Sequence, residues 1–317
     1  MSFNSGNNPD VVRTELDEVF FAEYEYASEP GIVTAESPVF FKQDSIDRGS
    51  VNSGQFGGTG AWTSHLEEES RVLATVRTAN AVNRTVLNFK RTLAIPQEFI
   101  EDDEGVGHGV VSEAVRHMAF RGRTSRDENA LGIYKDAFSG VTTNDAVALI
   151  SNSHTALDGR TNDNLETGAL SAANLEILFR VLLEQRGQDG SVGGHVGNGM
   201  LVPPILFPDA QEITKSELKQ GTANNDLNYF SQIYPGLVVS QSPFIGSVYN
   251  SLNSNAQTSY FLVSRGHSVK RWVRKGIETD IVPPQTDLQD RWFYKGRFRE
   301  IAGVISWEGI VGSNGTA

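Results

Sequence analysis

The side chains best placed for chemistry are Ser153, His154 and Asp158, where a histidine precedes an aspartate by four residues. An imidazole and a carboxylate at that spacing could bind a metal ion or relay a proton. The pair could instead close a turn, because Asp158 is followed by Gly159 and Asp-Gly is a common turn dipeptide. We favour the turn. A metal-assisted hydrolase built on His154 and Asp158 is the enzymatic alternative.

A second group, Asp102, Asp103 and Glu104, could supply paired carboxylates for acid–base catalysis or ligands for calcium. These residues precede a predicted helix, where carboxylates also stabilise the positive N-terminal end without any ligand. The six histidines are scattered, and the sequence contains no phosphate-binding loop, nucleophile elbow or zinc-protease motif. The sequence therefore predicts no catalytic residue, no metal and no cofactor, and it favours a protein that is not an enzyme.

Composition limits which classes of protein this chain could belong to. The chain has 317 residues, with 27 basic and 39 acidic side chains and a net charge of −12. Tight binding to nucleic acid usually needs a broad basic surface, so DNA is expected only as a weak, non-specific contact. The absence of cysteine excludes disulfides and thiolate metal sites and agrees with assembly in a reducing cytoplasm. No signal peptide and no apolar run of ~20 residues is present, so no membrane partner is expected.

Two segments near the N-terminus are too extended to be stable alone. Residues 1–37 carry eight acidic residues and one basic residue, with a short helix predicted within 11–27. Residues 44–70 are rich in glycine and small polar residues, while 72–78 and 85–95 have the composition and alternation of strands. This pattern indicates a glycine-tipped β-hairpin. Because an isolated hairpin is marginal in water, we expect it to gain order from a neighbouring molecule.

In the rest of the chain, helices come before strands. Helices are predicted at 107–138, at 171–186 with Ser171 as its cap, and after Pro208. Strands are predicted at 260–263, 269–274, 292–295 and 298–307. Helices followed by strands indicate an α+β fold.

Several short runs follow one another in a fixed order along the chain. They are Tyr134–Phe138, Asn152–Thr155, Asp158-Gly159, Leu170-Ser171, Leu201–Pro204, Asn224–Tyr229, Tyr260–Leu262, Arg265–Lys275 and Phe298–Glu300. Together they resemble the major capsid proteins of tailed bacteriophages with the Hong Kong 97-type fold, most closely the Mu-type head subunits. The resemblance extends over about residues 16–315. It implies a non-enzymatic shell subunit with that fold.

The resemblance also implies a division into four parts. These are an N-terminal arm at 1–37, an extended loop at 38–86, a peripheral domain at 87–160 and 260–317, and an axial domain at 161–259. The long predicted helix would be the spine of the peripheral domain. The axial domain would meet its copies at the five-fold and six-fold axes.

As partners, the resemblance implies further copies in hexamers and pentamers, a portal and packaged double-stranded DNA, in a virion capsid assembled in the host cytoplasm. A decoration protein stays an open question. Because Met1 stands almost directly before the arm, we expect scaffolding from a separate protein. Lys42 is the only lysine in the loop, and no covalent cross-link is expected. An encapsulin-type nanocompartment shell, which shares the fold, is the alternative.

Charge suggests how copies meet. Residues 261–317 contain nine lysines and arginines against six acidic residues, so the acidic arm of one copy could lie on the basic hairpin of another. The predicted interface residues are Glu15, Glu18, Phe20, Phe21, Glu23, Phe56, Trp62, Arg271, Arg274, Arg297 and Arg299. The alternative is that both segments are solvated faces, where ion pairs contribute little.

Overall fold

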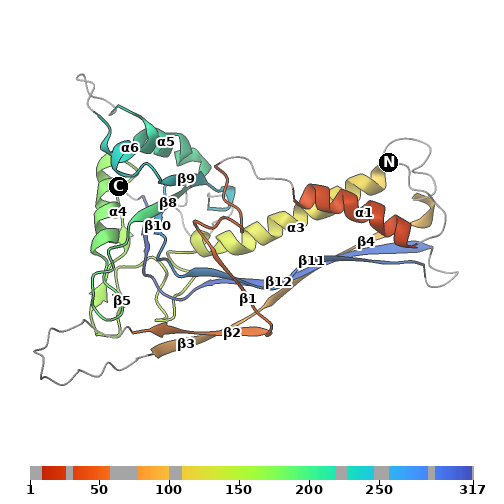
Figure 1. Cartoon of the computed structure of the whole chain (residues 1–317), viewed down its shortest axis with the longest axis horizontal. Helices are drawn as coiled ribbons and strands as arrows, with labels where there is room; N and C mark the ends of the chain where they lie inside the picture. Colours follow the sequence, from red (N-terminus) through yellow and green to blue (C-terminus); the bar gives the residue numbers. More distant parts are fainter. Residues whose placement is uncertain are drawn as a thin grey trace, which may run out of the picture.

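The computed structural model of the chain describes residues 9–25, 31–57, 78–99, 109–218, 227–245, 257–284 and 290–315. In this part of the chain, helices and strands form an α+β fold around a four-stranded and a five-stranded sheet. Figure 1 shows that the two sheets lie toward opposite ends of an elongated molecule. The predicted α+β class is confirmed.

The four-stranded sheet and the two helices that cover it form what we call the extended half. The strands follow the order β1 (Lys42–Ser45), β11 (Val269–Val282), β12 (Arg291–Val304) and β4 (Leu87–Pro96). β1 is parallel to β11, and the other neighbours are antiparallel. The separate strands predicted at 292–295 and 298–307 are one strand, because Gly296 stays in register with Thr279 and Arg91.

Helices α1 (Pro9–Tyr24) and α3 (Val110–Lys135) pack together on this sheet (Figure 1). The long helix predicted at 107–138 is confirmed as α3, which continues past Gly122 and Gly132. The apolar residues of both helices and of the strands meet in one buried cluster of Val12, Leu16, Val19, Phe20, Ile95, Val111, Val115, Met118, Ala119, Trp292 and Tyr294. Apolar residues spaced three and four apart on each helix produce this common face.

An antiparallel hairpin is present as predicted, but its second strand covers 78–85, between the strands predicted at 72–78 and 85–95, and residues 72–77 lie outside the described residues. Strands β2 (Ser50–Phe56) and β3 (Thr78–Thr85) are antiparallel, and they project from the body of the molecule with their open end away from α1 (Figure 1). The glycine-rich tip, with Trp62, lies outside the described residues. The strand predicted at 85–95 is confirmed as β4.

The five-stranded sheet and its helices form what we call the compact half. The strand order is β7 (Leu165–Glu166), β13 (Ile310–Ser313), β10 (Tyr260–Ser264), β8 (Gly197–Val202) and β9 (Val238–Gln241). Strands from both sides of residue 260 are hydrogen-bonded in this sheet. The predicted boundary between 161–259 and 260–317 therefore divides a single sheet and needs correction.

In the described part of the compact half, three α-helices pack: α4 (Ala172–Glu184), α5 (Phe207–Lys215) and α6 (Tyr229–Ile233). The predicted cap of α4 is confirmed, since Ser171 Oγ accepts a hydrogen bond from the Asn174 amide at 3.2 Å. A short 3₁₀ helix, η1 (Pro204–Leu206), precedes α5, and another, η2 (Pro243–Ile245), follows β9.

Strand β10 is buried on both of its faces. Tyr260 and Leu262 join the apolar cluster under α4, while Phe261 and Val263 join a second cluster that includes the C-terminal part of α3. Alternate side chains of a strand point to opposite faces, so one short strand connects two cores. None of the described helices is long and apolar enough to span a membrane.

Candidate functional site

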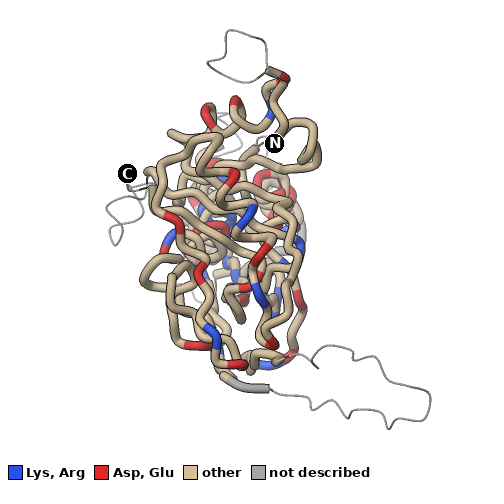
Figure 2. Tube along the Cα trace, turned by 90° about the vertical axis from the view of Figure 1, so that its left-hand side faces the viewer, with Lys and Arg blue, Asp and Glu red and all other residues tan. Residues whose placement is uncertain are grey.

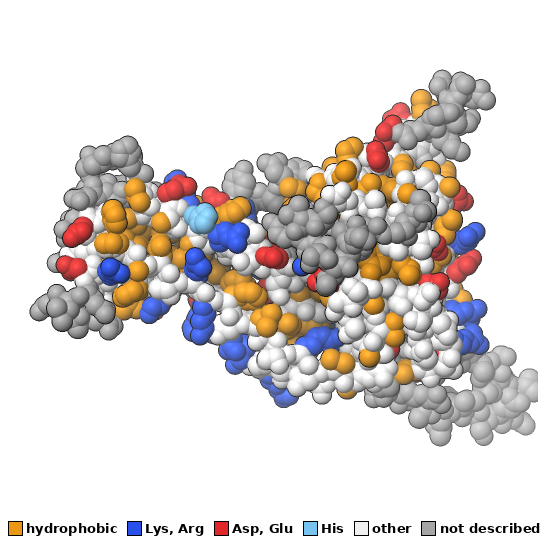
Figure 3. Space-filling view, turned by 180° about the vertical axis from the view of Figure 1, so that it is seen from behind, with side chains coloured by type: hydrophobic (Ala, Val, Ile, Leu, Met, Phe, Trp, Pro, Cys, Tyr) orange, Lys and Arg blue, Asp and Glu red, His pale blue; other side chains and the backbone are white. Residues whose placement is uncertain are grey.

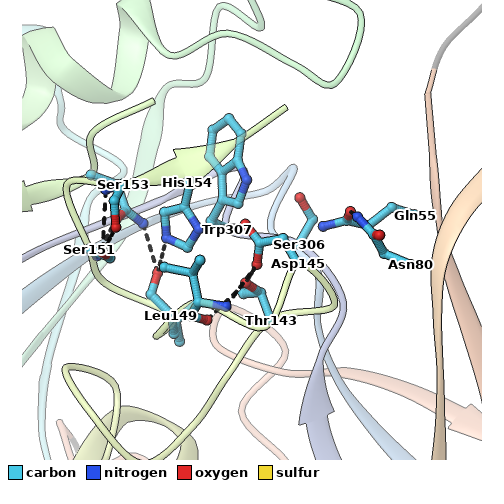
Figure 4. A network of polar contacts seen from close by, with 12 residues as sticks. Gln55, Asn80, Thr143, Asp145, Leu149, Ser151, Ser153, His154, Ser306 and Trp307 are labelled. Atoms are coloured by element: carbon cyan, nitrogen blue, oxygen red, sulfur yellow. Dashed lines mark hydrogen bonds and ion pairs between the residues drawn. The ribbon is translucent and has the colours of Figure 1, made fainter. Parts of the chain in front are cut away.

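His154 is buried, and both of its ring nitrogens have partners within the chain. Nδ1 lies 2.9 Å from Asp145 Oδ2, and Nε2 lies 3.2 Å from the Leu149 carbonyl oxygen. The imidazole stacks on Trp307 with a centroid distance of 5.4 Å (Figure 4). Burial would raise the pKa of Asp145, but hydrogen bonds from His154 and Thr143 outweigh it and hold that pKa below its ordinary value.

Asp158 takes no part in this pair. Its carboxylate lies 3.4 Å from Arg160, in a turn where the Gly159 amide donates to the Ala156 carbonyl at 2.9 Å. The turn interpretation is confirmed and the hydrolase alternative is wrong, because His154 and Asp158 have separate partners. Among the described residues, no three His, Asp or Glu side chains are grouped as metal ligands. Asp102, Asp103 and Glu104 lie outside the described residues.

The aromatic face of α1 packs against its own chain. Phe20 is 1% exposed, and its ring lies 6.0 Å from that of Tyr294, centroid to centroid. The Tyr294 hydroxyl donates to Asp17 at 2.7 Å, and burial together with the Asp17 carboxylate raises the pKa of Tyr294. Phe21 is half-buried against Phe20. The prediction that Phe20 is buried against a neighbouring copy is therefore wrong, because α1 and β12 enclose it.

The acidic residues of α1 also face their own chain in part. Glu18 and Glu23 line a shallow hollow that they share with Arg116 of α3. Glu15 is half-buried. Acidic and basic residues are interspersed over the described chain rather than separated onto two sides (Figure 2). The contact of this helix with a neighbour's basic hairpin stays a prediction.

Arg271 was predicted to lie at an interface between copies, but it is buried inside its own chain. Its guanidinium is 0% exposed and lies 3.4 Å from Glu300 and 2.5 Å from Gln43. Arg126 of α3 lies 3.4 Å from the same Glu300 carboxylate and 2.6 Å from Glu36. Burial raises the pKa of Glu300 more than the two guanidinium groups lower it. These charges hold the segment around β1 against α3 and β12.

Strand alternation could have identified Arg271 as an internal residue. Every second residue of a strand points to the same face, so Arg271 lies on the same face as Val269 and Val273. Val269 is buried, and this indicates that Arg271 is buried as well. The remaining candidates are at the surface or half-buried. Arg297 is exposed and pairs with Glu278 at 2.9 Å. The others are Phe56, which is 56% exposed, and Arg274 and Arg299, which are half-buried.

Sequence reasoning missed the polar cluster at the base of the hairpin. Arg84 of β3 donates to Ser53 Oγ at 2.6 Å and to Asn144 Oδ1 at 2.9 Å. Asn144 in turn donates to the Ser53 carbonyl at 2.7 Å. Further out, Asn80 donates to Gln55 at 2.7 Å (Figure 4). These bonds set the direction in which the hairpin leaves the body.

The compact half also exposes large apolar side chains around α6. They are Ile205, Leu218, Leu227, Tyr229, Ile233 and Val238. Leu218 and Leu227 face each other in an isolated β-bridge, and α5 contacts both α6 and η1. Such a concentration of exposed apolar side chains marks a surface for contact with another molecule.

Residues 79–313 match the model of the phage capsid protein family. No curated protein sequence gives a significant match. The fold is similar to the mature capsid of bacteriophage PhiM1 (TM-score 0.55, 10% identity), covering 90% of this chain and 89% of that one. It is also similar to the cyanophage Pam1 capsid (TM-score 0.54, 12% identity), covering 90% and 93%.

A virus-like particle from Pyrococcus furiosus has a similar fold as well, with a TM-score of 0.51, 10% identity and coverage of 95% of this chain and 98% of that one. At such identities the three structures establish the fold, whereas the match over residues 79–313 establishes the family.

Proposed function

We propose, from the premise that the chain belongs to the phage capsid protein family, that many copies of it assemble into the icosahedral head that encloses double-stranded DNA. The family match over residues 79–313 is the observation that carries this conclusion. The chain is accordingly a structural major capsid protein, and its activity is self-association.

We infer that the fold is the Hong Kong 97-type, in the branch of the Mu-type head subunits. The long helix α3, packed against the strands β4 and β12, supports a spine helix in a peripheral domain. The projecting strands β2 and β3 support an extended loop at 38–86. We keep 1–37 as the N-terminal arm, and we move β10 and β13 to the axial domain because their hydrogen bonds join that sheet.

The physical basis for assembly is that parts of the chain make too few contacts with the rest of their own copy to be stable alone. Two isolated strands are marginal in water, and β2 and β3 pair only with each other in the described structure. Phe56 at the open end of β2 is exposed. We propose that this end and the apolar surface around α6 contact neighbouring copies in hexamers and pentamers. The interface residues proposed are Glu15, Glu18, Phe21, Glu23, Phe56, Trp62, Arg274, Arg297 and Arg299.

A separate scaffolding protein and a portal are the further partners that we propose, with virion location and assembly in the host cytoplasm. DNA would touch the shell weakly, as the net charge of −12 suggests. A decoration protein on the outside of the shell is a further partner that we propose.

Expression of the full chain, alone and with its neighbouring genes, tests the proposal. We expect closed particles in electron micrographs and DNA in particles made with a portal and packaging proteins. Phe56→Asp should lower the particle yield without changing the circular dichroism spectrum. Val110→Asp, an equally exposed apolar position on α3, is the control. A chain that never forms closed particles would contradict the proposal, and shells with a protein cargo instead of DNA would favour a nanocompartment.

A further inference from the structure

Arg84 stands at the base of the hairpin formed by β2 and β3. The two strands have the sequences SVNSGQF and TANAVNRT, in which Arg84 is the one charged residue. Figure 3 shows mainly uncharged side chains on the lower side of the wider end of the molecule, the region where Figure 1 places β2 and β3. The contacts of Arg84 indicate why an arginine is present in an otherwise uncharged hairpin.

The guanidinium of Arg84 connects β3 to three other segments. It donates to Ser53 Oγ on β2, to Asn144 Oδ1 in the loop after α3, and to the Val304 carbonyl at the end of β12. Asn144 also donates to the Ser53 carbonyl. Among the described residues, the side-chain hydrogen bonds that join the hairpin strands to the body all involve Arg84 or Asn144. The angle at which the hairpin leaves the body therefore depends on this one cluster.

The acceptors around Arg84 are neutral. Burial lowers the pKa of Arg84, and none of its described acceptors is a carboxylate. If this position served only for packing, an apolar side chain would fill it without the cost of burying a charge. A planar guanidinium has five donors at fixed angles, so it can hold several acceptors in one relative orientation. Arg84 is thus suited to fixing an angle between segments.

The body leaves space for Arg84 and anchors its partner. A Cβ at Gly303 would lie 2.8 Å from Arg84 Nε and 3.2 Å from the Trp272 ring, so a glycine here leaves the space that the arginine occupies. Asn144 is held through its backbone amide, which donates to the Ile305 carbonyl at 3.0 Å. Arg84 therefore ties the hairpin to a part of the body that is itself fixed.

Beyond its base, the hairpin acts as a lever. Strands rise about 3.3 Å per residue, so the described strands extend ~25 Å, and a rotation of about 10° at the base moves the far end by about 4 Å. The hairpin also has a bond of its own further out, where Asn80, with a φ of 53°, donates to Gln55 across the strands at 2.7 Å. A change at Arg84 should therefore tilt the hairpin as a unit.

We propose that Arg84 fixes the angle between the hairpin and the body, and that this angle sets the curvature with which copies join into a closed shell. The inference rests on the proposed function, because there the hairpin contacts neighbouring copies. A contact repeated between identical copies closes only when the rotation between them is constant, so scatter in the angle produces open or irregular assemblies. Arg84 is a positioning residue for assembly and acts from within its own copy.

Distances between two spin labels in the unassembled chain test the first part. The chain has no cysteine, so Ala81→Cys on β3 and Glu128→Cys on α3 place one label on the exposed side of the hairpin and one on the body. With Arg84 the distance distribution should be single and narrow, and Arg84→Met should broaden it about twofold or more. Arg84→Lys keeps the charge but not the fork of donors and should fall in between. Arg160→Met removes an exposed arginine of the compact half and is the matched control, with an unchanged distribution.

Electron microscopy of the assembled variants, without labels, tests the second part. Arg84→Met should lower the share of closed particles of uniform diameter about threefold or more, with an unchanged circular dichroism spectrum, and Arg84→Lys should lower it less. Gly303→Ala tests the same angle without altering Arg84, because its methyl group would displace the guanidinium. It should broaden the label distances and the particle diameters as well. Arg160→Met should assemble like wild type.

Three results would overturn the proposal. Label distances that stay narrow in both Arg84→Met and Gly303→Ala would show that Arg84 does not fix the angle. Broad label distances combined with uniform particles would show that the angle does not set the curvature. Equal losses in Arg160→Met and Arg84→Met would show a general effect of charge.

Two further outcomes are separated by the design. If Arg84→Met does not fold, Arg84→Lys and Gly303→Ala decide the result, since both make smaller changes at the same cluster. Wild-type protein that forms no particles would contradict the proposed function, while the label distances would still show whether Arg84 fixes the hairpin.

Discussion

The extended half and the compact half differ in the kinds of side chain that are buried against their sheets. In the extended half, strands β11 and β12 place Arg271 and Glu300 in the interior, where Arg126 completes a charged cluster. In the compact half, every residue of β10 and β13 is buried, and the side chains packed around them are mainly apolar. One half is thus held partly by directed charge pairs and the other mainly by apolar packing.

The difference shows that a charged residue in this chain does not by itself mark a surface for another molecule. Arg271 and Arg297 lie on paired strands, yet the first is internal and the second is exposed. A buried charge is stable only when its partners are in place, while buried apolar residues can adjust their packing. The extended half should therefore tolerate loss of one partner less well than the compact half tolerates loss of a side chain.

The largest effect is expected from Arg271→Ala. Removal of one partner from a buried pair leaves a buried charge without compensation, so the free energy of unfolding should fall by about 4 kcal/mol. Urea unfolding of the unassembled chain measures this change. Arg297→Ala removes a cation from the same sheet at an exposed position and should cost less than about 0.5 kcal/mol. Equal losses in the two variants would contradict the internal role of Arg271.

Leu178→Ala should destabilise the compact half somewhat less. Leu178 on α4 is 1% exposed in the apolar cluster, and a buried leucine replaced by alanine costs about 3 kcal/mol. Leu183 on the same helix is 51% exposed. Leu183→Ala is the matched control and should change the free energy by about 0.5 kcal/mol or less. A loss in Leu178→Ala larger than that of Arg271→Ala would reverse the comparison.

The free energy of unfolding should depend on pH through His267, which lies where the two halves join. His267 lies between β10 and β11 and accepts a hydrogen bond from the Val269 amide at 3.2 Å. Burial and the nearby Lys42 lower the pKa of His267 to about 4. The folded state thus favours neutral His267, so its contribution is present above pH 6.5 and is lost as the pH falls toward 4.

Between pH 7 and pH 5 this loss should amount to about 2 kcal/mol. Urea unfolding at the two pH values measures it, with His267→Gln as the variant that removes this part of the pH dependence. His117→Gln, at an exposed position on α3, should keep the wild-type dependence. If His267→Gln and wild type lost stability in parallel, the junction would not be the sensitive point.

The smallest effect concerns the start of α4. Ser171→Ala removes the acceptor for the Asn174 amide and should cost about 1 kcal/mol, because loss of an N-cap leaves a helix amide without a partner. Thermal unfolding followed by circular dichroism is the measurement. Ser171→Asp keeps an acceptor and should stay close to wild type. A fall in both variants would mean that the serine acts through packing and not through its hydroxyl.

Local patterns account for the parts that the sequence predicted well. The three- and four-residue spacing of apolar residues located α3 and α4, Ser171 marked the start of α4, and alternation located β4. Two predicted strands proved to be the single strand β12, because its pairing with β4 and β11 continues through Gly296. Local sequence marks Gly296 as a break, and only neighbouring strands can keep it in the ladder.

By itself, the sequence determined four of the described helices, the presence of a hairpin, the α+β class and the resemblance to capsid proteins, all of which depend on residue types along the chain, but it did not predict the short helix α6 or the bounds of β3. Only the tertiary structure decided that His154 pairs with Asp145 and not Asp158, and that Arg271 is internal. It also brought Lys90 and Arg121 to one groove. The physical reason is that periodicity is a property of neighbouring residues, whereas charge pairing depends on which distant segments the folded chain brings within a few ångströms.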